Sequence, residues 1–243
     1  MDWMNSGFWV SLLEIIWVNI LLSGDNAVVI ALAARGLKPQ HQRMAIIGGS
    51  GAAILMRVGL TLFAVALLQL PWLKLVGSVL LVYIGIQLLL GEEDQDDDKD
   101  GASHSVWVAI RTILIADLVM SLDNVLAVAG AAASAPPETQ TPLLIIGLGL
   151  SIPLIVFGST LLLQLMEKLP VLITLGAALL GWVAGEMAVA DNGLQDLLAT
   201  HAPALHEFHR LPETAGLIGA ILVVMGGRLL RRRHTAAVVE PGK

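Results

Sequence analysis

The chain has 243 residues, of which 56% are hydrophobic and 14% charged, and its formal net charge is −6. Soluble domains carry about a quarter charged residues, whereas here the charges gather in short tracts between apolar stretches long enough for a bilayer core, which takes ~20 helical residues. The composition predicts a polytopic membrane protein, so the net charge belongs to loops and no nucleic-acid partner is expected. The absence of cysteine excludes disulfides, thiolate metal sites and cysteine nucleophiles.

Seven membrane-spanning helices are predicted, in chain order, at residues 8–34, 44–69, 72–91, 106–134, 142–166, 169–190 and 214–231. These long apolar runs do not alternate as barrel strands do, so the expected fold class is an all-α integral membrane protein. Turn signals separate the helices at Pro39, Pro71, Pro136-Pro137 and Pro170. The first apolar run follows no basic n-region and has no small-residue cleavage site, so we expect it to remain as a helix.

The distribution of lysine and arginine predicts the orientation. With the N-terminus outside, the inner side collects most basic residues, namely Arg35, Lys38, Arg43, Lys99, Arg111, Lys168, Arg228, Arg231, Arg232 and Arg233. Only Lys74 and Arg210 lie outside in this arrangement. We therefore expect a cytoplasmic C-terminal tail at 232–243 and a cytoplasmic acidic linker at 92–105. The linker is either a solvated segment or a tether that concentrates cations near an entrance.

The two halves of the sequence resemble each other. The stretch "LLSGDNAVVIALA" contains Asp25-Asn26, and "VMSLDNVLAVAGA", about a hundred positions later, contains Asp123-Asn124. The same alignment pairs Asn19 with Asp117, Ser23 with Ser121, Gly59 with Gly158, Thr61 with Thr160, Pro71 with Pro170, Gly77 with Gly176, Tyr83 with Trp182 and Gln87 with Glu186.

This alignment predicts a single membrane domain with one repeat at 8–91 and a second at 106–190. An outer loop at 191–213 and the seventh helix at 214–231 would follow. Because each repeat holds three helices, the second enters the membrane from the opposite side. Such inverted repeats are typical of secondary transporters, whose sites lie near the midplane.

Four acidic residues lie deep inside predicted spans, namely Asp25, Asp117, Asp123 and Glu186, with Arg57 as the one deep cation, whereas Glu14 lies nearer the outer end of the first span. A charge at the bilayer centre costs at least ~2.5–3.5 kcal/mol on insertion scales, so it indicates a function unless it serves interhelical hydrogen bonds. Carboxylates together with the amide oxygens of Asn26 and Asn124 suit a hard divalent ion such as Mg²⁺, Ca²⁺ or Mn²⁺. In an empty site the carboxylates would hold protons, as a metal/proton exchanger requires.

The spacing within the fourth span raises a question, because Asp117 and Asp123 lie about 120° apart around an unbroken helix. Either a helix is interrupted near the Asp-Asn pair or the site is broad, and Gly24 permits an interruption in the first span. Arg57 aligns with a Val or an Ile in the second repeat. It is a candidate counter-ion for the empty site, or it pairs elsewhere or snorkels.

Two groups of polar residues lie nearer the membrane surfaces. Asn19 and Asp191 are candidates for the ion path, although Asp191 could simply end its helix. The outer loop "HAPALHEFHR" holds His201, His206 and His209. It is either an amphipathic interfacial helix beginning near Asp196 or a source of metal ligands.

The stretches "LLSGDNAVVIALAARGL" and "ADLVMSLDNVLAVAGAA" resemble the TerC family of integral membrane proteins, most closely its short YjbE-like branch, over the first six spans. The family is similar to the LysE-type exporters and is associated with manganese efflux and tellurite resistance. The resemblance implies Mn²⁺ as the transported ion and the bacterial inner membrane as the location. It also implies an ion path lined by Asp25, Asn26, Asp117, Asp123 and Asn124, with Glu186 as a weaker member.

Our leading interpretation is a divalent metal ion exporter, with Mn²⁺ favoured, that works by alternating access between inverted repeats. Moving one charge outward against 100 mV costs ~2.3 kcal/mol, so export needs a driver, and two inward protons per ion would make the cycle electroneutral. The expected partners are the metal ion, protons and the lipid bilayer, without a prosthetic group and with a homo-oligomer left open.

Two alternatives remain. One is an intramembrane aspartyl-type hydrolase that uses Asp25 and Asp123 as an acid/base dyad, although such a dyad does not need Asn26 and Asn124. The other is an exporter of small organic cations or amino acids, for which the fourth span offers few aromatic or roomy polar positions. Of these readings we favour the one in which the protein is not an enzyme.

Overall fold

A computed structural model of the chain describes residues 6–21, 24–68, 70–91, 99–133 and 137–239. The described residues form helices joined by short turns, which confirms the all-α fold class. The helices are α1 (Ser6–Leu21), α2 (Gly24–Ala34), α3 (Pro39–Leu68), α4 (Leu73–Leu90), α5 (Lys99–Ala133), α6 (Pro137–Lys168), α7 (Val171–Val189), α8 (Asn192–His201), α9 (Pro203–His206) and α10 (Leu211–Val239). Among these described helices, 6 contain a stretch long and apolar enough to cross a membrane.

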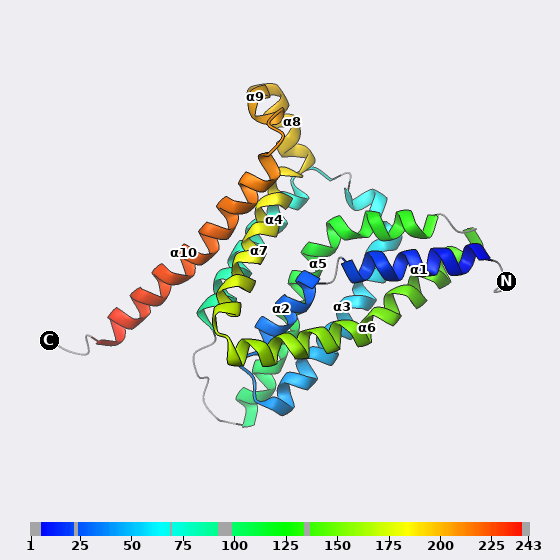
Figure 1. The fold of residues 1–243 in the computed structure, drawn as a ribbon. Coiled ribbons are helices and arrows are strands. Elements are labelled where there is room, and N and C mark those ends of the chain that lie inside the picture. Colours follow the sequence, from blue (N-terminus) through cyan, green and yellow to red (C-terminus); the bar gives the residue numbers. More distant parts are fainter. Residues whose placement is uncertain (1–5, 22–23, 69, 92–98, 134–136, 240–243) are drawn as a thin grey trace. The chain divides into compact units, whose positions relative to one another are not determined.

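The first predicted span, 8–34, is divided between two helices. α1 ends at Leu21 and α2 begins at Gly24, and the two helices run in different directions (Figure 1). They have 16 and 11 residues, so neither alone reaches the ~20 residues of a bilayer core. In contrast, α5 is one helix of 35 residues that passes through both Asp117 and Asp123. The change of helix therefore occurs beside Gly24, and the count of seven spans stays a prediction.

One compact unit comprises Met1–Leu70 and Asp98–Leu165. Within it α3 packs along α5, and α1 and α2 both contact α5. A Cβ atom on Gly49 of α3 would lie 2.8 Å from the Ile113 side chain of α5. Likewise, a Cβ atom on Gly147 of α6 would lie 2.5 Å from the Ile15 side chain of α1. Glycine at these positions lets the helices approach closely, as is common in membranes.

The other compact unit comprises Pro71–Asp97 and Met166–Lys243. In it α4, α7 and α10 pack against one another (Figure 1). A Cβ on Gly181 of α7 would lie 2.4 Å from the Gly219 carbonyl oxygen, and one on Gly185 would lie 2.0 Å from the Ala215 carbonyl oxygen of α10. Small residues spaced four apart on both helices thus bring the backbones of α7 and α10 together. Each unit combines helices from the first and second halves of the sequence.

Several element boundaries differ from those predicted. α5 begins at Lys99, inside the predicted linker 92–105, and residues 92–98 lie outside the described residues. α10 continues to Val239, through most of the predicted tail 232–243, because residues 228–240 contain neither glycine nor proline. The predicted outer loop contains α8, which begins at Asn192 rather than near Asp196.

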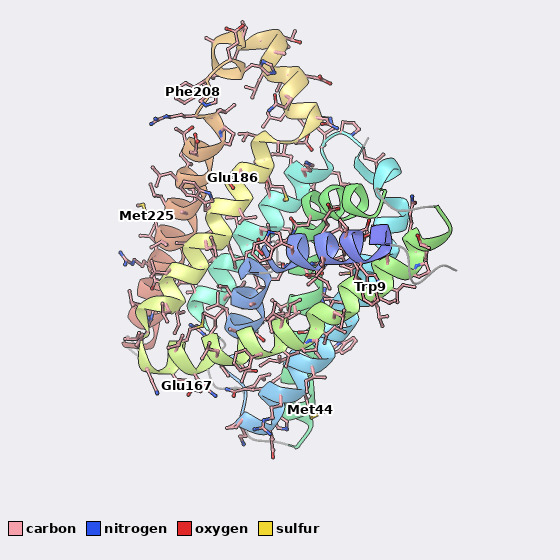
Figure 2. The ribbon with its side chains drawn as sticks, turned by 45° about the vertical axis from the view of Figure 1, so that its right-hand side comes forward. Trp9, Met44, Glu167, Glu186, Phe208 and Met225 are labelled. Carbon is pink, nitrogen blue, oxygen red and sulfur yellow. The ribbon has the colours of Figure 1, made fainter. Side chains whose placement is uncertain are left out.

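The outer surfaces of both units are apolar. Trp9 of α1, Met44 of α3 and Met225 of α10, labelled in Figure 2, are 55%, 61% and 55% exposed. Exposed apolar side chains of this size on long apolar helices are what a lipid-facing surface requires, because lipid tails take the place of a protein core. The side chains therefore support the assignment of an integral membrane protein.

Candidate functional site

Arg57 lies in α3 and is buried, with 1% of its surface exposed. Its Nη2 atom forms an ion pair with Oδ1 of Asp117 on α5, and its Nε atom donates a hydrogen bond to Ser121 Oγ at 3.0 Å. The Ser121 hydroxyl donates in turn to Asp117 Oδ2 at 3.2 Å. Because Asp117 and Ser121 are one turn apart on α5, both present acceptors to the same guanidinium group. The three side chains form a closed network inside the unit.

Asp25 lies in the same compact unit as this network. It occupies the first turn of α2, where the positive end of the helix dipole favours a carboxylate. Its Oδ1 atom accepts a hydrogen bond from the Asn26 backbone N–H at 2.8 Å. α2 contacts both α3 and α5, the helices that carry Arg57 and Asp117. The unit therefore contains one acidic residue from each expected repeat together with a buried cation.

The structure describes the side chains of only some of the remaining predicted ligands of this unit. Asn26 is buried, with 3% exposed, and Asn124 is partly buried on α5. The backbones of Asn19 and Asp123 belong to α1 and α5, but the positions of their side chains lie outside the described part of the structure. Within the part that is described, no group of three Asp, Glu, His or Cys side chains could hold a metal ion. The six-residue ligand set therefore stays a prediction.

Glu186 belongs to the second compact unit, on α7, where it is partly buried (Figure 2). The residue aligned with it, Gln87 of α4, donates a hydrogen bond to the Tyr83 hydroxyl at 3.2 Å. The ligand set expected from the sequence is consequently divided between the two units, with Asp25, Asn26, Asp117, Asp123 and Asn124 in the first.

Asp191 is fully buried and caps two helices at once. Its carboxylate accepts a hydrogen bond from the backbone N–H of Leu194 at 3.2 Å, which caps the start of α8. It also accepts bonds from three N–H groups at the start of α4, those of Trp72 at 3.0 Å, Lys74 at 3.1 Å and Leu75 at 3.3 Å. These four donors account for the burial of Asp191, whose place in an ion path stays a prediction.

The backbone at Trp72 adopts a left-handed conformation, with φ of 68°. A bulky residue rarely takes this conformation without compensation. Here the Trp72 N–H is bonded to Asp191, and its ring lies against Gly193, where an added Cβ would be 2.7 Å from the indole. Asp191 and Gly193 together hold the turn that starts α4.

The three histidines of the outer segment are all exposed, on or beside α8 and α9. The Nδ1 atom of His201 lies 3.2 Å from the Leu197 carbonyl oxygen of its own helix. Neither His206 nor His209 belongs to a described metal-ligand group. The segment is helical over α8 and α9, whereas its location at a membrane surface stays a prediction.

Ser121 is the member of the site to which the sequence analysis assigned no role. It is fully buried, and it contacts both Arg57 and Asp117. Its spacing of one helical turn from Asp117 was a usable signal, because residues four apart share one helix face. Its identification required the position of Arg57, which only the packing of α3 on α5 provides.

The model of the integral membrane protein TerC family matches residues 4–236 of the chain. Over 198 residues the chain is 46% identical to the uncharacterized membrane protein YjbE of Bacillus subtilis, covering 82% of this chain and 88% of that protein. It is 27% identical over 213 residues to the uncharacterized membrane protein YkoY of the same organism, covering 65% of YkoY.

A third relative, the inner membrane protein YoaE of Escherichia coli, is 28% identical over 145 residues, which cover 52% of this chain and 28% of YoaE. The similarity to YoaE thus concerns a minor part of that longer protein. No solved structure matches the chain.

Proposed function

Because the chain belongs to the TerC family of integral membrane proteins, we propose that it exports a hard divalent metal ion, with Mn²⁺ favoured, across the bacterial inner membrane. The observation that carries this proposal is the buried ion pair of Arg57 with Asp117, in the same compact unit as Asp25. The two aspartates come from different helices, α2 and α5, which contact each other. Ionisable groups within a membrane domain are rare and mark ion pathways.

Inverted repeats are part of the proposal, and the packing of the first unit supports them. Gly147 of α6 lies against Ile15 of α1, whereas Gly49 of α3 lies against Ile113 of α5. Ile113 is the residue that aligns with Ile15. Each of these aligned glycines therefore approaches the aligned isoleucine of the other repeat, although α3 packs along much of α5 and the described residues show no comparable packing of α6 along α1. A reciprocal contact of this kind is expected of two halves related by a two-fold axis.

Near Arg57 the alignment of the two repeats is set by Gly59 with Gly158 and Thr61 with Thr160. The same offset pairs Arg57 with Val156. The site would thus be two-fold in its Asp-Asn pairs and asymmetric at Arg57.

The proposed ion path combines side-chain and backbone oxygens. Asp25, Asn26 and Asp117 would supply ligands from α2 and α5, with Asp123 and Asn124 completing the set and Asn19 along the path, all within the first compact unit. The last turn of α1 ends beside α2, and the last carbonyl groups of a helix have no partner within it. Such carbonyl groups coordinate cations in transporters with discontinuous helices. An oxygen-only site favours hard divalent ions over soft ones.

Proton influx is the proposed driver. Export of a divalent ion against 100 mV requires about twice ~2.3 kcal/mol, which two inward protons per ion would offset by removing net charge movement. The carboxylates that release the ion would take up these protons from the outer side. In this topology the N-terminus is outside and the C-terminus is in the cytoplasm.

The proposal is tested by Mn²⁺ flux in proteoliposomes under an imposed proton gradient. Wild type is compared with Asp25→Asn and Asp123→Asn, and with Glu14→Gln, whose side chain is exposed on α1. Gradient-driven flux that is lost in both aspartate variants and kept in Glu14→Gln supports a two-fold carboxylate site. Equal flux in all four proteins, or none in the wild type, would overturn the proposal.

A further inference from the structure

We propose that Arg57 is a tethered cation that holds Asp117 while the site is empty, so that a divalent ion binds only by displacing Arg57 from Asp117. This inference rests on the proposed function and deepens it, because it makes Arg57 a specificity-determining residue. A monovalent ion, with half the charge, would displace a guanidinium group less effectively.

The contacts of Asp117 carry the first step of the argument. Oδ1 is paired with Arg57 Nη2, and Oδ2 accepts the Ser121 hydroxyl, so each carboxylate oxygen already has a donor. A metal ion bound directly to Asp117 would lie within a few ångströms of the guanidinium. Two cations at that separation repel strongly in a buried site, where solvent screening is weak. The ion and Arg57 therefore exclude each other at Asp117.

The repeat-related positions carry the second step. Arg57 aligns with Val156, and its partner Asp117 aligns with Asn19. Arg57 and Asp117 are both charged, whereas the residues aligned with them, Val156 and Asn19, are both neutral. The alignment of the two repeats thus reproduces the Asp-Asn pairs but not this ion pair. A charged pair that only one repeat carries points to a role of Arg57 beyond helix packing.

The charge of the empty site carries the third step. Without an ion, Asp25 and Asp117 would be two neighbouring carboxylates in an apolar unit, and each bare charge carries a desolvation penalty. Arg57 is paired with Asp117, so it neutralises one of these two charges while the site is empty. An arriving divalent ion would take over this role from Arg57. The exchange of one cation for another would keep Asp117 compensated in both states, so that the incoming protons are needed only by the other carboxylates.

The test measures Mn²⁺ transport in proteoliposomes for Arg57→Gln, for the double variant Arg57→Val/Asp117→Asn, and for Arg111→Gln, an exposed arginine of α5. We expect Arg57→Gln to lower the KM for Mn²⁺ by roughly tenfold, or ~1.4 kcal/mol, because the ion no longer competes with a cation for Asp117. We also expect a lower maximal rate, because no cation then displaces the bound ion for release. In the double variant the lost competitor and the lost carboxylate ligand change the KM in opposite directions, so we expect its signature to be a weaker preference for Mn²⁺ over Na⁺ than in the wild type. Arg111→Gln should match the wild type.

The double variant keeps the test decisive if Arg57→Gln fails to fold, because its pair of Val and Asn repeats the neutral pair at positions 156 and 19. Folding is followed by size-exclusion chromatography in detergent. A folded double variant that prefers Mn²⁺ over Na⁺ as strongly as the wild type would show that the ion pair is only structural and would overturn the inference while leaving the proposed function standing. A folded Arg57→Gln with wild-type KM would do the same. A wild type that moves no Mn²⁺ would overturn both.

Discussion

Arg57 of α3 and Asp117 of α5 are sixty residues apart in the sequence and form an ion pair in which both side chains are buried. The pair joins the two helices that pack most extensively in the first compact unit. Ser121 bonds to both partners, so the network leaves neither charge without a hydrogen bond. A buried pair of this kind responds differently to the loss of one partner and to the loss of both.

The first prediction concerns stability. Asp117→Asn leaves the Arg57 guanidinium without its counter-charge and should lower the free energy of unfolding by about 3–5 kcal/mol. Adding Arg57→Val should recover much of this loss, because the buried charge is then absent. Thermal unfolding in detergent micelles measures both effects. Losses that simply add in the double variant would contradict the coupling of the two residues.

The second prediction separates transport from folding at Asp25. Asp25→Asn removes the charge but keeps a side-chain oxygen able to accept the Asn26 N–H bond. We therefore expect Asp25→Asn to change the free energy of unfolding by less than about 1 kcal/mol and to abolish Mn²⁺ flux. Flux and thermal unfolding are measured on the same preparation. Retained flux in a folded Asp25→Asn protein would remove Asp25 from the ion site.

The third prediction distinguishes an ion site from a hydrolytic dyad. Asn26 is buried beside Asp25, and its amide is an ion ligand in the proposed site. Asn26→Ala should raise the KM for Mn²⁺ roughly tenfold, which corresponds to ~1.4 kcal/mol. Asn124→Ala should act in the same direction. Intact transport in both variants would count against the ligand assignment, since a hydrolase would not need either amide.

The fourth prediction concerns the double cap at Asp191. Asp191→Ala removes acceptors from the first turns of both α4 and α8. Loss of one cap costs about 0.5–2 kcal/mol, so the loss of two should cost about 1–4 kcal/mol. Asp196→Ala, at an exposed position of α8, is the control and should stay within about 0.5 kcal/mol of the wild type. Equal melting temperatures for the two variants would contradict the capping role.

The fifth prediction concerns the contact of α7 with α10. A Cβ on Gly185 would lie 2.0 Å from the Ala215 carbonyl oxygen, so Gly185→Ala must push the backbones apart. We expect a loss of about 1–3 kcal/mol, as for other overpacked positions. Gly51→Ala of α3 is the matched control, because nothing lies within 4 Å of its added Cβ. The Gly51→Ala control should raise the free energy of unfolding by about 0.5–1 kcal/mol, because alanine favours a helix more than glycine does. Destabilisation by both changes would contradict a specific close contact of α7 with α10 at Gly185.

Features that depend on residues close together in the sequence could be predicted from the sequence alone. The length of apolar runs predicted long helices, because a bilayer sets the length of a span. Gly24 indicated where the first run changes helix, and the sequence alignment showed that Arg57 has no charged counterpart. Acidic residues inside apolar runs identified the candidate site, because their cost is a property of the residue and its depth. The helix start at Asn192 was missed, because its cap at Asp191 was not recognised.

The partners of these residues were decided only by the tertiary structure. The sequence offered three aspartates to Arg57, and the packing of α3 on α5 selected Asp117 with Ser121. Asp191 similarly acquired its bonds to α4 from a turn more than a hundred positions away. Membrane helices are apolar on every side, so no amphipathic stripe marks the face that meets another helix. Which side chains meet therefore depends on close helix approach at residues such as Gly49 and Gly147.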